Sequence, residues 1–115
     1  NEEELRNVLP GGFFCTLAGF GVRQQIDLFA SKRRIVAPHG AALTNILFCG
    51  PGTKALEIIP PGYDLKSTYH SLACAAGIDY CFYVADQAPD SEAGRHGNMR
   101  LDIDAFRRDI EGWLS

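Results

Sequence analysis

One short segment brings together residue types that can bind an anion. His39 and Gly40 precede Ala41 and Ala42, and Asn45 follows about one turn later. Glycine and alanine leave the backbone N–H groups accessible, and a helix that begins here has a dipole that favours a phosphate. His39 can donate a ring N–H to the same anion, more strongly when it is protonated. Asn45 either reaches the ligand or braces the turn.

His39 also has a purely structural interpretation. A single histidine beside a glycine is a weak motif, and such a side chain can cap a helix or fill the corner at a strand end. The chain contains neither the G-x-x-x-x-G-K-S/T loop of ATPases nor the G-x-G-x-x-G loop of dinucleotide-binding proteins, which argues against both functions. It also lacks the G-x-S-x-G elbow of serine hydrolases.

Glu57 is the second chemically unusual residue, because it interrupts the apolar run from Ala55 to Ile59. Burying a carboxylate is costly unless it is paired or lies near an open end of the strand. A functional Glu57 would accept hydrogen bonds from the hydroxyls of a ribose or a sugar. A structural Glu57 would form a salt bridge to a residue such as Arg34 or Lys54. The residues leave both alternatives open.

The elements that must position these residues alternate between strands and helices. We therefore predict an α/β fold, a Rossmann-like parallel sheet of about four strands with flanking helices. Ligands of such sheets bind beyond the carboxyl ends of the strands, where His39 follows its strand. Compact apolar runs predict the strands, and helical spacing, with Asp102 and Gly77 as caps, predicts the helices. The strands are expected at 13–17, 34–37, 55–59 and 80–84, and the helices at 2–9, 22–32, 41–49, 67–76 and from 103 onward.

Composition limits the class of protein. The chain has 115 residues and a formal net charge of −3, which argues against a nucleic-acid-binding face. We expect one domain over residues 1–115, with a mobile surface loop at 87–100. No apolar run is long enough to span a membrane. The four cysteines form no C-x-x-C pair and lie in apolar stretches, so we expect buried free thiols rather than disulfides or a zinc site.

Several blocks of the sequence resemble glycosyltransferase family 61, above all His-Gly-Ala-x-Leu-Thr-Asn in Ile35–Phe48 and the later Glu-Ile-x-Pro that starts at Glu57. That family includes plant xylosyltransferases and arabinosyltransferases, O-linked N-acetylglucosaminyltransferases and bacterial proteins of capsular polysaccharide biosynthesis. The resemblance implies a two-domain GT-B fold, of which this chain would be a truncated, donor-binding part of the C-terminal half. The N-terminal half would be its missing partner. Lys32 departs from the family pattern, which usually has a small apolar residue there.

The resemblance also implies roles for single residues. His39, Gly40, Ala41 and Ala42 would hold the diphosphate of a nucleotide-sugar, which is expected to be UDP-linked, and Asn45 would support that turn. Glu57 would contact the nucleotide or the sugar. His39 would be catalytic by stabilising the leaving nucleoside diphosphate.

The implied reaction is an inverting transfer that needs no metal or other cofactor. The acceptor would be a glycan, a polysaccharide or a protein. The alternative is a non-catalytic nucleotide-binding or structural Rossmann-like module. We expect a cytoplasmic protein that could also associate with a membrane. The alternative is the lumen of the Golgi or the ER in a eukaryote.

Overall fold

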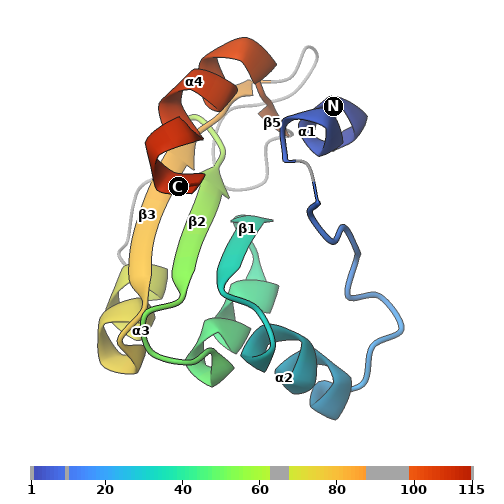
Figure 1. The fold of residues 1–115 in the computed structure, drawn as a ribbon, viewed down its shortest axis with the longest axis vertical. Helices are drawn as coiled ribbons and strands as arrows, with labels where there is room; N and C mark the ends of the chain where they lie inside the picture. The colour runs from blue at the N-terminus through green and yellow to red at the C-terminus, as the bar shows by residue number, and fades with distance from the viewer. Residues whose placement is uncertain (1, 10, 63–67, 88–98, 115) are drawn as a thin grey trace.

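The computed structural model of the chain describes residues 2–9, 11–62, 68–87 and 99–114. Strands and helices alternate along the central part of the chain, which confirms the predicted α/β class (Figure 1). The helices are α1 (Glu2–Val8), α2 (Val22–Ala30), the 3₁₀ helix η1 (Ala41–Phe48), α3 (Thr68–Ala76) and α4 (Ile103–Leu114). The strands are β1 (Arg34–Pro38), β2 (Lys54–Ile59), β3 (Asp79–Val84), β4 (Asp86–Gln87) and β5 (Met99–Arg100).

The main sheet has three parallel strands in the order β1-β2-β3. β2 is the central strand and is almost completely buried, which explains its nearly unbroken apolar sequence. The register pairs Ala37 with Glu57, and Glu57 with Phe82. These three side chains therefore share one face of the sheet, near the carboxyl ends of the strands. β4 and β5 form a separate antiparallel pair.

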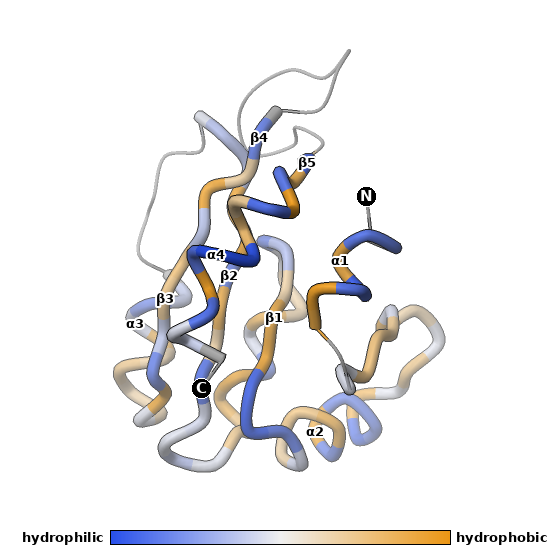
Figure 2. The backbone as a smooth tube through the Cα atoms, turned by 45° about the horizontal axis from the view of Figure 1, so that its top comes forward, coloured by the Kyte–Doolittle hydropathy of each residue, from blue (hydrophilic) through white to orange (hydrophobic). Residues whose placement is uncertain are grey.

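Two hydrophobic cores lie on opposite faces of this sheet. The helices α1 and α4 cover one face, where Phe106 and Ile110 of α4 pack on Leu56 and Ile58 of β2. In Figure 2 the turns of α4 alternate between hydrophilic and hydrophobic residues, as a helix with one buried face requires. The helices α2, η1 and α3 cover the other face, around Ala55. The result is a three-layer arrangement that is compatible with a Rossmann-like fold.

The strand predicted at 13–17 is wrong. This segment has no regular secondary structure, and Phe13 keeps 65% of its surface exposed. Its aromatic rings contact cations instead of a sheet: Arg6 lies 4.6 Å from the ring centroid of Phe14, and the Lys32 ammonium lies 5.0 Å from that of Phe13. An apolar run becomes a strand only when a neighbouring edge pairs with it, so the main sheet has three strands rather than four.

The helix predicted at 41–49 exists, but it is a 3₁₀ helix. With three residues per turn, the buried stripe follows positions three apart, and Leu43, Ile46 and Cys49 are 2%, 0% and 7% exposed. α-Helical spacing would place Leu47 on the same side as Leu43 and Ile46. It falls off the stripe and is 43% exposed.

Both predicted helix caps are confirmed. The Asp102 carboxylate accepts a hydrogen bond from the Ala105 N–H at 3.1 Å, just before α4 begins. Gly77 ends α3 with a φ of 71°, and the Ile78 N–H donates to the Ala73 carbonyl at 2.9 Å. This reversal leads the chain directly into β3 and so fixes where that strand begins. Position 67, where the α3 prediction began, and residues 88–98 of the predicted loop lie outside the described residues.

The cysteines only partly match the prediction. Cys49 is buried and Cys81 is half-buried, but Cys15 and Cys74 are exposed, and all four are free thiols. Cys15 is exposed because its segment does not join the sheet, and Cys74 because it lies on the outer side of α3. Among the helices in the described ranges, none combines the length and apolarity that crossing a lipid bilayer requires.

Candidate functional site

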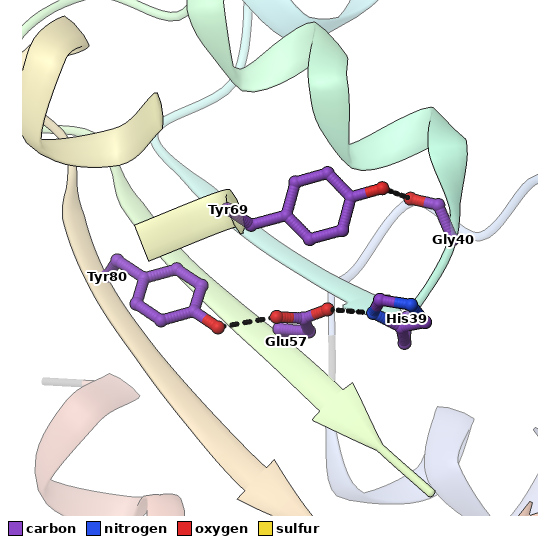
Figure 3. A network of polar contacts seen from close by, with 5 residues as sticks. All are labelled: His39, Gly40, Glu57, Tyr69 and Tyr80. Carbon is purple, nitrogen blue, oxygen red and sulfur yellow. Dashed lines mark hydrogen bonds and ion pairs between the residues drawn. The ribbon is translucent and has the colours of Figure 1, made fainter. Parts of the chain in front are cut away.

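A row of three polar side chains crosses the main sheet from β1 to β3 (Figure 3). The Nδ1 atom of His39 lies 2.6 Å from Oε2 of Glu57, and the Tyr80 hydroxyl donates to Oε1 of the same carboxylate at 2.5 Å. His39 directly follows β1, Glu57 lies in β2 and Tyr80 in β3. The carboxylate is therefore bonded at both oxygens, one from each neighbouring strand.

Burial makes these bonds important. Glu57 is only 3% exposed, so an unpaired carboxylate at this position would be strongly disfavoured. An ionised carboxylate only accepts hydrogen bonds, so the bonded form of His39 carries its proton on Nδ1. When the ring is protonated on both nitrogens, the contact becomes an ion pair. Burial, and then the hydrogen bond to Glu57, raise the pKa of Tyr80 well above its ordinary value. Tyr80 therefore remains a donor throughout the physiological range.

The turn after β1 is fixed from two directions. The His39 N–H donates to the Ile58 carbonyl of β2 at 2.7 Å, which extends the parallel ladder by one bond. The Tyr69 hydroxyl of α3 donates to the Gly40 carbonyl at 2.7 Å. The Tyr69 ring also meets the His39 ring edge-on, with centroids 5.6 Å apart. Gly40 itself is extended, with φ 169° and ψ 165°, a conformation that any residue can adopt.

The residues after the turn begin η1. Ala41 and Ala42 are exposed, and the helical hydrogen bonds start with the Leu43 N–H donating to the Gly40 carbonyl at 3.1 Å. Asn45 does brace this region, because its Nδ2 donates to Oε1 of Gln25 in α2 at 2.9 Å. The structure thus places His39, Gly40 and Glu57 together, with Ala41 and Ala42 directly beyond them.

The predicted salt-bridge partners of Glu57, Arg34 and Lys54, are wrong. The register pairs Arg34 with Lys54, three residues before Glu57, and the Lys54 ammonium bonds the Trp113 carbonyl at 3.4 Å. The real partners are His39 and Tyr80. Local sequence patterns predict α3 and β3, but they predict no role in the site for Tyr69 or Tyr80. The available signal was the parallel order of the strands, which brings a polar residue of each strand to the same face.

Metal ligands do not accompany this row. In the part of the chain that the structure describes, no three His, Cys, Asp or Glu side chains come together in a way that could hold a metal ion. Phe82 lies next to the row instead. It is the register partner of Glu57, faces the same side of the sheet and is 49% exposed. The site therefore combines a buried carboxylate, a histidine and an accessible aromatic ring.

Two comparisons with known proteins each match about half of the chain. The model of the family Glycosyltransferase 61 matches residues 1–56. A xylan glycosyltransferase, MUCI21 of Arabidopsis thaliana, is 40% identical over 55 residues, which are 46% of this chain and 11% of that protein. The chain therefore corresponds to a small part of this relative's length.

The family match includes His39 through Asn45 and ends one residue before Glu57. Tyr69 and Tyr80 lie beyond it. The turn that the structure builds after β1 is thus the part of the site that the family shares with this chain. On this match, about the first half of the chain is similar to glycosyltransferase family 61.

Proposed function

We propose that this chain is the donor-binding part of a glycosyltransferase. The enzyme would transfer a sugar from a nucleotide-sugar, with inversion, to a glycan, polysaccharide or protein acceptor. The observation that carries the proposal is His39, held by Glu57 at the carboxyl edge of a parallel sheet and followed by three small residues. The family match over residues 1–56 supports transferase chemistry, and the three-layer arrangement is compatible with one half of a GT-B fold.

The turn after β1 would hold the diphosphate. The first N–H groups of a helix have no partner within the helix, and Ala41 and Ala42 are exposed at that position. Gly40 adds no side chain above them. A diphosphate can therefore approach the backbone closely, which matters because the chain as a whole is slightly acidic and offers no general attraction for an anion.

His39 would act on the leaving group. Its Nδ1–H is committed to Glu57, so a protonated ring offers its second N–H, at Nε2, to a phosphate oxygen. When an acceptor hydroxyl attacks the anomeric carbon, the bond from that carbon to the diphosphate breaks and negative charge grows on the phosphate. A positioned donor of this kind contributes about 10²–10³ in rate. Direct contact of Glu57 with the nucleotide or sugar stays a prediction.

Phe82 supports a nucleotide ligand rather than a bare anion. Its half-exposed ring lies beside Glu57 on the same face of the sheet. An accessible aromatic ring next to an anion site suits a planar base, and stacking of a base on such a ring is worth about 1–3 kcal/mol. We assign Phe82 as a candidate stacking surface for the base.

The test uses a glycine whose backbone tolerates a side chain. A Cβ at Gly40 would lie 3.9 Å from its nearest neighbour, the Pro38 carbonyl, so Gly40→Ala should fold normally while placing a methyl group where the diphosphate approaches. Gly50→Ala is the matched control, because Gly50 lies in open space. In the full-length protein, Gly40→Ala should weaken UDP binding by at least about tenfold, a 1.4 kcal/mol effect, with an unchanged melting temperature. Equal affinity in the two variants would remove the turn from the donor site.

A second measurement addresses chemistry. His39→Ala in the full-length protein should lower turnover by at least about tenfold, the minimum expected for loss of a charge-stabilising donor. Unchanged turnover in a folded variant would exclude this role. If UDP, GDP and CMP all fail to bind the full-length protein at millimolar concentration, the non-catalytic structural alternative is correct.

A further inference from the structure

We propose that Tyr80 is a positioning residue, which acts through Glu57 to fix the proton of His39 on Nδ1. The role of that proton in phosphate binding rests on the proposed function, whereas the contacts among the three residues do not. It adds to the site a residue on β3, a strand beyond the part of the chain that the family model matches.

The geometry places Glu57 between two donors. Tyr80 donates to one carboxylate oxygen and His39 bonds the other, and the carboxylate is 3% exposed. A carboxylate held at one oxygen can still rotate about its last bond, whereas one held at both oxygens cannot do so without losing a hydrogen bond. The Tyr80 hydroxyl therefore decides whether the second oxygen stays directed at the imidazole ring.

Tyr80 is itself well supported. It lies two residues before Phe82, the register partner of Glu57, and its ring contacts the ring of His70 on α3, with centroids 5.7 Å apart. Glu57 from β2 bonds the Nδ1 atom of His39, and Tyr69 from α3 meets its ring edge-on. Tyr80 bonds the same carboxylate as His39 does, so an effect of Tyr80 on His39 passes through Glu57.

The position of the proton matters for anion binding. With the proton on Nδ1, a neutral His39 has an acceptor at Nε2, and that nitrogen becomes a donor only when the ring takes up a second proton. The paired carboxylate compensates the charge of that protonated ring. Tyr80 thus helps to ensure that Nε2 of His39 donates a hydrogen bond only when the ring is positively charged. A charged donor is the form that suits a diphosphate.

The test measures the tautomer directly. With ¹⁵N-labelled histidine, the ring-nitrogen shifts of His39 in the wild-type protein should show the proton on Nδ1 at a pH where the ring is neutral. Tyr80→Phe should convert this state into a mixture of both tautomers. Tyr69→Phe is the matched control: it also removes one hydroxyl from the site, but one that bonds the Gly40 carbonyl, and it should leave the Nδ1 tautomer in place. A wild-type tautomer in Tyr80→Phe would overturn the proposal.

A second variant covers the case in which Tyr80→Phe does not fold. Replacing Tyr80 by 3-fluorotyrosine keeps the ring and the hydroxyl but makes the hydroxyl a stronger donor. Because the hydroxyl still holds one oxygen of Glu57, His39 in this variant should keep its proton on Nδ1, as in the wild type. A mixture of tautomers in this variant would contradict the proposal. Neither experiment contains a donor or an acceptor, so failure here is distinct from failure of the proposed transferase function.

Discussion

Glu57 and His39 meet side by side although they are eighteen positions apart in the sequence, with Oε2 and Nδ1 2.6 Å apart. The contact arises because β1 and β2 are neighbouring parallel strands whose register pairs Ala37 with Glu57. His39, just past the end of β1, can then fold its ring back over the sheet. The pair is thus a product of strand order and register, two properties that a local motif does not contain.

Replacing Glu57 by glutamine should destabilise the protein. The change keeps the volume but removes the charge that strengthens the bonds to His39 and Tyr80, and such bonds are worth about 1.5–3 kcal/mol each. We expect a loss of about 2 kcal/mol in the free energy of unfolding, measured by urea titration. Glu111→Gln, on the exposed side of α4, is the control and should change stability little. Equal stability of the two variants would mean that the buried network contributes nothing.

High pH should weaken the fold through Tyr80. Because the pKa of Tyr80 is raised in the folded protein, this phenol keeps its proton while the same group in the unfolded chain ionises above its ordinary value of 10.0. The folded state then binds more protons than the unfolded state, so the free energy of unfolding falls as pH rises above about 10. Burial also raises the pKa of Tyr83, Cys49 and Cys81, so part of the fall has other sources.

The Tyr80 share of this effect can be isolated. Tyr80→Phe has no ionisable group at that position, so its stability should decline less steeply than that of the wild type between about pH 9 and about pH 11. Urea unfolding at several pH values measures the two slopes. Parallel slopes would show that Tyr80 ionises equally in the folded and unfolded chains.

Asn45 and Gln25 should behave as one unit. Their side chains share a hydrogen bond of 2.9 Å between η1 and α2. Each alanine variant should lose about 0.5–1.5 kcal/mol, and the double variant should lose clearly less than the sum. Thr44→Ala, at an exposed neighbouring position, serves as the control. Strict additivity would mean that the bond is not formed. If Asn45 also touches a ligand, only its own variant should weaken nucleotide binding.

The 3₁₀ register of η1 gives a prediction that α-helical spacing does not. Ile46 is fully buried and its neighbour Leu47 is 43% exposed. Ile46→Ala should cost about 2–5 kcal/mol, the range for emptying a core site. Leu47→Ala removes the same number of carbon atoms from a largely solvated position, and should cost about 0.5 kcal/mol or less. Thermal or urea unfolding of the two variants decides the matter, and similar losses would indicate the α-helical register instead.

Much of the fold could be predicted from local sequence. The strand before His39, the apolar strand with Glu57 and the helix capped by Asp102 all have strong local signals, and the structure contains each of them. The segment at 13–17 could not be predicted correctly, because an apolar run does not reveal whether a sheet edge is available to it. Arg6 and Lys32 each contact one of its aromatic rings, and these contacts depend on the folded positions of three separate segments.

Only part of the candidate site could be predicted from local sequence in the same way. His39 and Gly40 were predicted from residue type and position, and Glu57 from its cost within an apolar strand. Tyr80 could not be assigned, because its role depends on a side chain reaching diagonally from β3 to β2, and no spacing in the chain encodes that reach. The expected cationic partner of Glu57 was wrong for the same reason.

The row of His39, Glu57 and Tyr80 also has a consequence for how the chain reaches this fold. Sliding β2 by one residue against its neighbours would turn Glu57 into the core formed by α1 and α4, beside Phe106 and Ile110. A carboxylate buried there without its two donors is among the least tolerable errors that a sheet can make. The same three residues that are available for chemistry therefore also favour the correct strand register. They destabilise misaligned sheets that hydrophobic pairing alone would tolerate.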